Sequence, residues 1–361
     1  MTMSMSRVGL DVHAHETTAV VLDPSTGEIE IRRIAGRPAS VLAWLETVAT
    51  PFQAVYEAGP TGYGLARRAQ AAGLDVVVCA PGHILKNASD RIKTDKRDAL
   101  RLARLLVAGE LKLVRVPSPS QEQLRDLVRA REDVRVDLMR LRHRISKFLL
   151  RRELYWDGGN SWTVRHRDWL GQRRFPDRAS EIVFADALNA HDTMLERRDR
   201  LERSLAEAAL DSPLAATVAG LRCLKGIDTL SALGLQAEVL DWHRFPQAKL
   251  VSSFFGLVPS EHSSGERRRQ GQITKAGSKH ARRLLVEAAW HYRHPPRVSA
   301  KLARRQAGQD ARAIAIAWRC QRRLYGRWQE LAARRGKPAP VVAVAVAREL
   351  ASFCWEIGTL D

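Results

Sequence analysis

The sequence predicts an α/β domain at the amino end of the chain, followed by a mainly helical remainder. Runs rich in β-branched residues fill about the first 80 positions, and long stretches with helical spacing of apolar residues follow them. The charge also changes sign between the two ends. The chain has 361 residues, of which 45% are hydrophobic, so it can bury the cores of two or three domains.

Three strand-like segments come before the first helix-like stretch. VGLDVH and TTAVVLD are β-branched, PSTGE is a turn sequence, and IEIRRI returns to alternation. A helix is expected at about 38–48, a strand at QAVYEAG, a helix ending at Gly73, a strand at LDVVVCA and a helix in DKRDALRLARLLVAGEL. This order matches a ribonuclease H-like sheet better than a doubly wound nucleotide-binding fold, which begins β-α-β.

Two long helices are predicted next, at about 120–153 and 178–209, with the break WDGGNSW between them. The first carries a heptad seam in which Arg131 is the one polar residue. The apolar seam residues are Leu124, Leu127, Val134, Leu138, Leu141, Ile145 and Phe148. An antiparallel helical pair follows from this pattern, either within one chain or with a second chain.

The formal net charge of +19 favours a polyanionic partner. Residues 1–60 hold four Lys/Arg and seven Asp/Glu, whereas residues 261–340 hold twenty Lys/Arg and five Asp/Glu. Such a division suggests metal-assisted chemistry at one end and phosphate binding at the other. The four cysteines form no CxxC pair, which argues against zinc and disulfides and for a reducing, intracellular compartment. No signal peptide or membrane span is expected.

Four carboxylates are spaced so that such a fold would bring them together. Asp11 lies in the middle of the first strand, where a charge is costly without a partner such as a cation. Glu57 ends the fourth strand, which neighbours the first in a ribonuclease H-like sheet, and Asp95 and Asp98 share one face of a helix start. These oxygen ligands suit Mg²⁺ or Mn²⁺, and two such ions can support phosphoryl transfer. The ordinary alternatives are helix-capping acids and a surface glutamate.

A second candidate site is the segment EHSSGERRR, which contains Ser263 and Ser264. A serine needs an activating base or a cation-rich site to act as a nucleophile, and nearby arginines could bind the scissile phosphate. The alternative is a phosphate-binding loop whose serines only donate hydrogen bonds. The basic residues expected to contact nucleic acid are Arg267, Arg268, Arg269, Lys275, Lys279, Arg282 and Arg283.

The segment LRCLKGIDTLSALGL resembles a helix-hairpin-helix, whose turn amides bind phosphates without reading sequence. Asp228 stands where the second turn glycine is usual. An ordinary pair of packed helices is an equally good interpretation.

Four segments carry a resemblance to a known family: GLDVHAHETTAVVLD, VYEAGPTGYGLARRAQAAG, IKTDKRDALRLARLL and FFGLVPSEHSSGERRRQGQITKAGSKHARRLL. They cover both ends of the chain in the expected order. The chain as a whole resembles the DEDD-type transposases of the insertion-sequence-110 family, the bridge-RNA-guided recombinases. The match in the middle of the chain is limited to its helical, coiled-coil-like character.

The resemblance implies a RuvC-like domain at 1–115, a helical coiled-coil region at 116–212 and a C-terminal transposase domain at 213–361. It implies that the metal-binding tetrad is Asp11, Glu57, Asp95 and Asp98. The catalytic serine falls on the SSG motif, with Ser263 preferred and Ser264 the alternative nucleophile. SGER replaces the more usual SGGK, so Arg267 would supply the basic role.

The implied partners are donor and target DNA, a structured guide RNA and further copies of the chain, as a dimer and then a tetramer, in the cytoplasm. A Holliday-junction-type nuclease would need the acidic tetrad but neither Ser263 nor the basic C-terminal region. A non-catalytic nucleic-acid scaffold would leave the strand-centre Asp11 unexplained.

Overall fold

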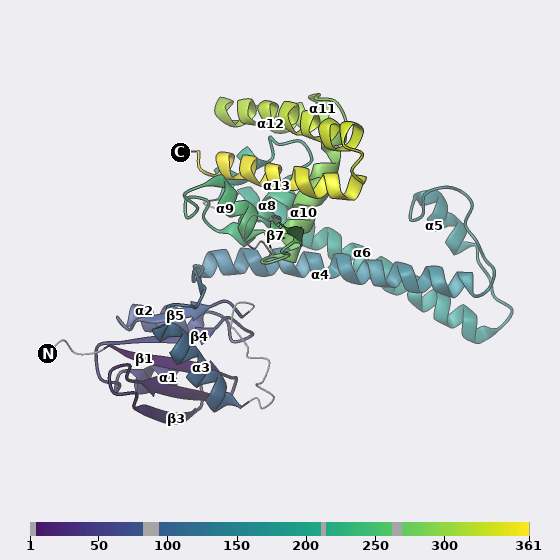
Figure 1. The fold of residues 1–361 in the computed structure, drawn as a ribbon. Helices are drawn as coiled ribbons and strands as arrows, with labels where there is room; N and C mark the ends of the chain where they lie inside the picture. The colour runs from purple at the N-terminus through teal and green to yellow at the C-terminus, as the bar shows by residue number, and fades with distance from the viewer. Residues whose placement is uncertain (1–4, 82–93, 211–213, 262–268, 361) are drawn as a thin grey trace. The chain divides into compact units, whose positions relative to one another are not determined.

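The structure, a computed structural model, describes residues 5–81, 94–210, 214–261 and 269–360. They form two compact units, Met1–Ser118 and Pro119–Asp361 (Figure 1). The first unit is mixed α/β and the second is mainly helical, as the sequence predicts.

A mixed six-stranded sheet in the order β3-β2-β1-β4-β5-β6 forms the first unit. The strands are β1 (Ser6–Val12), β2 (Glu16–Leu22), β3 (Ile29–Ala35), β4 (Phe52–Glu57), β5 (Val76–Cys79) and β6 (Leu113–Val114). β1 pairs antiparallel with β2 and parallel with β4, and β4 pairs parallel with β5. This arrangement is consistent with the ribonuclease H-like fold, and the first and fourth strands are neighbours as predicted.

Helices cover both faces of this sheet. They are α1 (Pro38–Leu45), α2 (Gly64–Ala71) and α3 (Asp95–Val107). One core joins α1 and α2 to sheet residues that include Leu10 and Tyr56. A second, smaller core joins α3 to Val55 and Cys79 on the opposite face. Because strand side chains alternate between faces, odd-numbered residues of β1 and β4 face α3.

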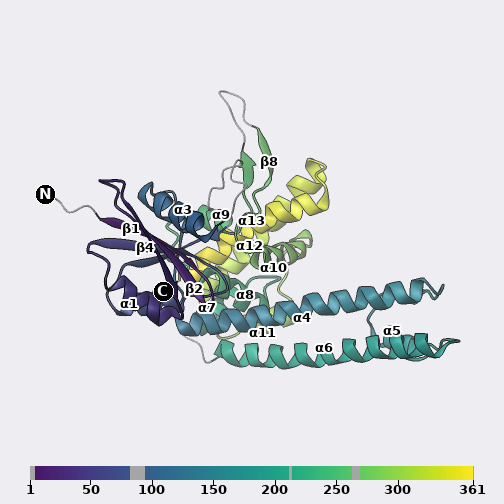
Figure 2. The same cartoon turned by 90° about the horizontal axis from the view of Figure 1, so that it is seen from below.

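Two long helices, α4 (Pro119–Leu150) and α6 (Arg178–Leu210), lie side by side in the second unit (Figures 1 and 2). Side-chain hydrogen bonds join Arg131 to Glu202 and Arg142 to His191, and Arg152, just after the end of α4, donates to Ser180. Since the partner number falls along α6 as it rises along α4, the pair is antiparallel and forms within one chain. Arg131, the polar residue in the seam, therefore has an acidic partner across the pair. The short helix α5 (Val164–Gly171) in the connection was not predicted.

The remaining elements build the C-terminal core. They are α7 (Ala215–Leu221), α8 (Thr229–Val239), α9 (Ala248–Phe254), β7 (Pro259–Glu261), β8 (Gln270–Ile273), α10 (Lys279–Ala289), η2 (Trp290–Arg293), α11 (Ala300–Gln306), α12 (Ala311–Gln329), η3 (Glu330–Arg334) and α13 (Ala339–Gly358). α13 is apolar through most of its length and supplies nine buried residues. Leu124 and Val128 of α4 and Leu205 and Ala209 of α6 join the same cluster, so the base of the long pair is anchored in it.

All four cysteines are buried and free, so none of them forms a disulfide. Within the described ranges, no helix is both long and apolar enough to span a membrane.

Candidate active site

The acidic site is built around an unusually close approach of α3 to β1. Gly9 faces α3, and a Cβ atom added there would lie 1.9 Å from the carbonyl oxygen of Ala99 and 2.8 Å from the amide nitrogen of Ala103. Such distances are impossible for a real side chain. Glycine is therefore required, because it lets the helix backbone lie directly against the strand.

That approach sets the position of the first turn of α3 against the end of β1. Asp11 shares the face of Gly9, two residues further along the strand. The hydroxyl of Thr94 accepts a hydrogen bond from the amide of Arg97 and so caps the start of α3. Asp95 occupies the first position of the helix, one turn before Ala99. The structure thus brings Asp11 and Asp95 together.

His13 lies between these two carboxylates and was missed by the sequence analysis. Its Nε2 is 3.4 Å from Oδ2 of Asp11 and 3.9 Å from Oδ1 of Asp95. One potential ligand atom from each of the three residues lies within 4.8 Å of the other two. The signal for His13 was its place two residues after Asp11, which puts both on the same side of an extended chain. Asp11 is the last but one residue of β1, so its predicted place in the middle of the strand was wrong.

The electrostatics at Asp11 fit a cation site. Burial raises the pKa of Asp11; His13 opposes this shift, while the charges of Asp95 and Asp98 add to it. The ionised form of Asp11 is therefore disfavoured when only protein groups surround it. A divalent cation would reverse this cost, because it neutralises the mutual repulsion of the carboxylates.

The other two predicted ligands lie beside this group. Glu57 follows the last paired position of β4, Leu10 opposite Tyr56, so it is the cross-strand neighbour of Asp11 and faces α3. Burial, with the charge of Glu57 added to it, raises the pKa of the Cys79 thiol to about 11. Asp98 forms an ion pair of 3.2 Å with Arg101. Neither belongs to the compact group formed by Asp11, His13 and Asp95.

The predicted nucleophiles fall outside the described residues. β7 and β8 form an antiparallel hairpin in which Pro259 pairs with Ile273 and Glu261 with Gln270. The residues between the two strands include the segment 262–268, which lies outside the described ranges. It contains Ser263, Ser264, Arg267 and Arg268, so their geometry is not part of this description.

The basic residues after the hairpin differ in their surroundings. Lys275 and Lys279 are exposed. Arg282 is instead part of the local structure, because its Nη1 donates hydrogen bonds to the carbonyl oxygens of Phe255 and Ala276, at 2.8 and 2.9 Å. Arg269 also has an interaction partner of its own.

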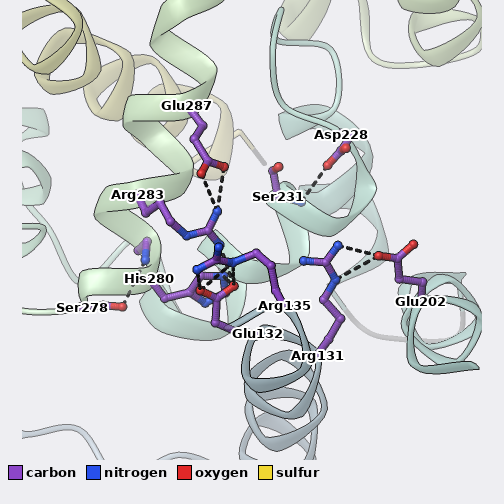
Figure 3. A network of polar contacts seen from close by, with 11 residues as sticks. Arg131, Glu132, Arg135, Glu202, Asp228, Ser231, Ser278, His280, Arg283 and Glu287 are labelled. Atoms are coloured by element: carbon purple, nitrogen blue, oxygen red, sulfur yellow. Dashed lines mark hydrogen bonds and ion pairs between the residues drawn. The ribbon is translucent and has the colours of Figure 1, made fainter. Parts of the chain in front are cut away.

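Arg283 belongs to a polar network between α4 and α10 (Figure 3). Its Nη2 donates to Oε2 of Glu132 at 2.7 Å, and its Nη1 donates to Glu287 at 2.7 Å. Arg135 donates to the same Glu132 carboxylate, and His280 lies 3.7 Å from it. Because α10 follows the β7–β8 hairpin in the chain, this network links the helix after the hairpin to α4 of the long helical pair.

Comparison with known proteins identifies the class of protein to which this chain belongs. A family model described as "Transposase" matches residues 8–152, and one described as "Transposase IS116/IS110/IS902 family" matches residues 219–303. The first contains the acidic site and the second contains the β7–β8 hairpin. The protein is therefore a DNA transposase, an enzyme that acts on DNA. More particularly, the chain belongs to the insertion-sequence-110 family of these enzymes.

Relatives match along nearly the whole chain. "Putative transposase y4qE" of Sinorhizobium fredii is 38% identical over 97% of this chain and 87% of its own length. "Transposase for insertion sequence element IS1533" of Leptospira borgpetersenii is 30% identical over 91% of this chain and 97% of its own. "Transposase for insertion sequence element IS1111A" of Coxiella burnetii is 23% identical over 60% of this chain.

Proposed function

We propose that this transposase cuts and rejoins DNA with two sets of residues: a metal-binding tetrad of Asp11, Glu57, Asp95 and Asp98, and the nucleophile Ser263. The observation that carries the proposal is the meeting of Asp11 and Asp95 beside Gly9, on the sheet face that Glu57 also shares. We assign the tetrad to a RuvC-like domain at 1–115, which precedes a helical region at 116–212 and a transposase domain at 213–361.

The tetrad would hold Mg²⁺ or Mn²⁺. Carboxylate oxygens are the preferred ligands of both ions, and the metal would supply Lewis acidity at the scissile phosphate. His13 is close enough to orient Asp11 and Asp95 or to take part in binding. Arg101 holds Asp98 by its ion pair, which fixes that carboxylate before the ion arrives.

Ser263 would act on the DNA strand itself. Its Oγ would lose its proton and form a bond to phosphorus while the bond from phosphorus to one sugar oxygen breaks. The leaving sugar oxygen would take up a proton and become a hydroxyl, so that one proton passes overall from the serine to the sugar. The resulting phosphoserine ester keeps a phosphoester bond, so a second sugar hydroxyl can displace the serine without an external energy source. The basic side chains Lys275 and Lys279, both exposed, would contact the neighbouring phosphates.

The test is to trap covalent protein–DNA adducts on denaturing gels. Wild type with Mg²⁺ should form adducts, whereas Asp11→Asn, Ser263→Ala and wild type in excess EDTA should form none. Ser264→Ala serves as the matched control and should retain them. Adducts that persist in Ser263→Ala and disappear in Ser264→Ala would reassign the nucleophile. Cleavage without adducts in wild type would favour hydrolysis by the acidic site alone, as in a junction-resolving nuclease.

We also propose that a structured guide RNA supplies sequence specificity, and that the chain works as a dimer that assembles into a tetramer. The support is the resemblance together with the lack of a recognition-helix or zinc-finger signature in the sequence. Base pairing by a guide can provide specificity that phosphate contacts cannot. Recombination should fail with RNA-free protein and return when the cognate RNA is added. Site-specific recombination by protein stripped of RNA would contradict the proposal.

A further inference from the structure

A cavity of about 690 Å³ lies in the C-terminal core, away from the serine segment in sequence. We call it the hairpin cavity, because the turn between α7 and α8 forms one wall. The connection after η2 and the helix α11 form the other walls. Its charged lining residues are Lys225, Asp228, Arg297, Lys301 and Arg305.

Positive charge dominates this lining. Four lysine and arginine side chains line the cavity with one carboxylate, so positive charge exceeds negative charge even when Asp228 is counted in full. Asp228 caps α8, because its Oδ1 accepts a hydrogen bond from the amide of Ser231 at 2.9 Å. The hairpin cavity therefore keeps an excess of unneutralised positive charge.

Two of the cations are held in place by the walls themselves. Nζ of Lys225 donates to the carbonyl oxygens of His294 and Pro295, at 3.5 and 3.2 Å. Arg305 donates from Nη1 to the carbonyl oxygen of Ile227 in the turn. Its Nε is buried and has no hydrogen-bond partner within the described part of the chain. The hydrogen bonds of Lys225 and Arg305 fix the positions of both cationic groups at the cavity.

The other two cations are free to meet a ligand. The side chains of Arg297 and Lys301 are exposed, and within the described ranges neither enters a hydrogen bond or an ion pair. They are the groups through which a strand in solution would first contact the cavity.

The turn is shaped to bring its backbone close to these groups. Gly226 has a φ of +85°, and a Cβ added there would lie 2.7 Å from the carbonyl oxygen of Ala288 and 2.9 Å from Cδ2 of His291. Only glycine allows the turn to pack this closely against the end of α10. The amides of the first turn of α8, an eleven-residue helix, then begin at the cavity wall. The carboxylate of Asp228 already accepts a hydrogen bond from one of these amides, so the cationic side chains supply the attraction for an anion.

We infer that the hairpin cavity binds a phosphodiester group of a polynucleotide backbone, without reading the base sequence. A backbone phosphate offers the negative charge that the lysine and arginine side chains of the lining leave unbalanced. The inference concerns binding only, so it does not depend on which residues cleave the strand. It extends the set of nucleic-acid contacts beyond the segment 267–283 considered above.

The test uses the full-length protein in EDTA, so that no strand is cut. Affinities for a mixed-sequence DNA duplex and for an RNA hairpin are measured by fluorescence anisotropy over a range of salt concentrations. The cavity variant combines Arg297→Gln with Lys301→Gln. Its matched control combines Arg322→Gln with Lys337→Gln, which removes the same charges from exposed sites outside the cavity.

The cavity variant should bind about tenfold more weakly than the control, and its plot of log affinity against log salt should lose about two units of slope. Arg297→Lys, which keeps the charge, should retain most of the wild-type slope. A loss with only DNA or only RNA would identify the polynucleotide that the cavity holds. Equal affinities and slopes for the cavity variant and the control, with unchanged melting temperatures, would overturn the inference.

Discussion

Gly9 decides how closely α3 lies against β1, and through that distance it decides where Asp95 meets Asp11. The residue carries no chemistry of its own. Any side chain at this position would overlap the backbone of α3, so the helix would have to move away from the strand. The geometry of the acidic site therefore depends on a residue two positions before its first carboxylate.

Gly9→Ala should both destabilise the first unit and weaken its response to metal. Overpacking of this kind costs about 1–3 kcal/mol of unfolding free energy. Mg²⁺ should raise the melting temperature of wild type by binding the folded state, and this increase should shrink in Gly9→Ala. Differential scanning calorimetry with Mg²⁺ and with EDTA measures both effects. Gly64→Ala is the control, because an added Cβ there meets nothing within 4 Å. An unchanged metal response in Gly9→Ala would contradict the argument.

The sequence singled out candidate metal ligands, but it did not show which of them lie closest together. A charge at the centre of an apolar strand and two acids three residues apart are local patterns, so Asp11, Asp95 and Asp98 could be singled out. His13 was missed although its spacing from Asp11 was a signal, because its place between two carboxylates depends on the gap between β1 and α3. Gly9 could not either, since a glycine in a strand does not reveal which backbone approaches it.

At the scale of elements, Glu132 of α4 joins that helix to α10 by its ion pair with Arg283. Burial tends to raise the pKa of Glu132, but the hydrogen bonds from Arg135 and the charge of Arg283 outweigh burial and hold that pKa below its ordinary value of 4.5. The folded state therefore favours the ionised carboxylate. This stabilisation is fully present above the unfolded-state pKa and is lost as pH falls from about 4.5 through the lower folded-state pKa.

Glu132→Gln should lower the free energy of unfolding by about 1–3 kcal/mol at neutral pH, since it leaves two arginines with a weaker shared acceptor. The difference from wild type should shrink as the pH is lowered below about 4.5. Glu287→Gln is the matched control, because Glu287 contacts the same Arg283 but its side chain is 59% exposed. That change should cost about 0–1 kcal/mol. Urea titrations at several pH values give the comparison, and equal losses in the two variants would refute the assignment.

Most of the helices and strands could be predicted from the sequence. The order of strands and helices in the first unit and the two long helices follow from local periodicity, and they are confirmed. The sequence left open whether the seam pairs within a chain or between chains, because heptad spacing is the same in both cases. The pairings of Arg131 with Glu202 and of Arg152 with Ser180 settle the intrachain pairing, and neither was visible from spacing alone.

At the scale of the molecule, the far end of the α4–α6 pair carries exposed apolar side chains. They include Leu150, Tyr155, Val164, Ile182 and Val183, with Val164 79% exposed. Exposed apolar groups that gather in one region are typical of protein–protein contact. These exposed side chains could form the subunit contact of the predicted oligomer, because the heptad seam of α4 already packs against α6 of the same chain.

Light scattering of the purified protein should show a dimer or a larger species. Val164→Ser combined with Ile182→Ser should shift the population toward monomer, because the contact would lose apolar area. Val341→Ser, at a 55% exposed position on α13, serves as the control and should leave the mass unchanged. A strict monomer in wild type, with and without nucleic acid, would contradict the expected assembly.

The length of α4 has a consequence for the geometry of DNA. Its 32 residues extend over about 48 Å at 1.5 Å per residue. The base is fixed in the C-terminal core, and the far end has an aromatic cluster of its own around Phe148 and Phe184. In B-form DNA the same distance corresponds to about 14 base pairs at 3.4 Å each. Removal of seven residues from each helix would keep the seam in phase and shorten this spacer by about 10 Å, or about three base pairs. A subunit joined at the far end would then meet its DNA on a different side of the double helix.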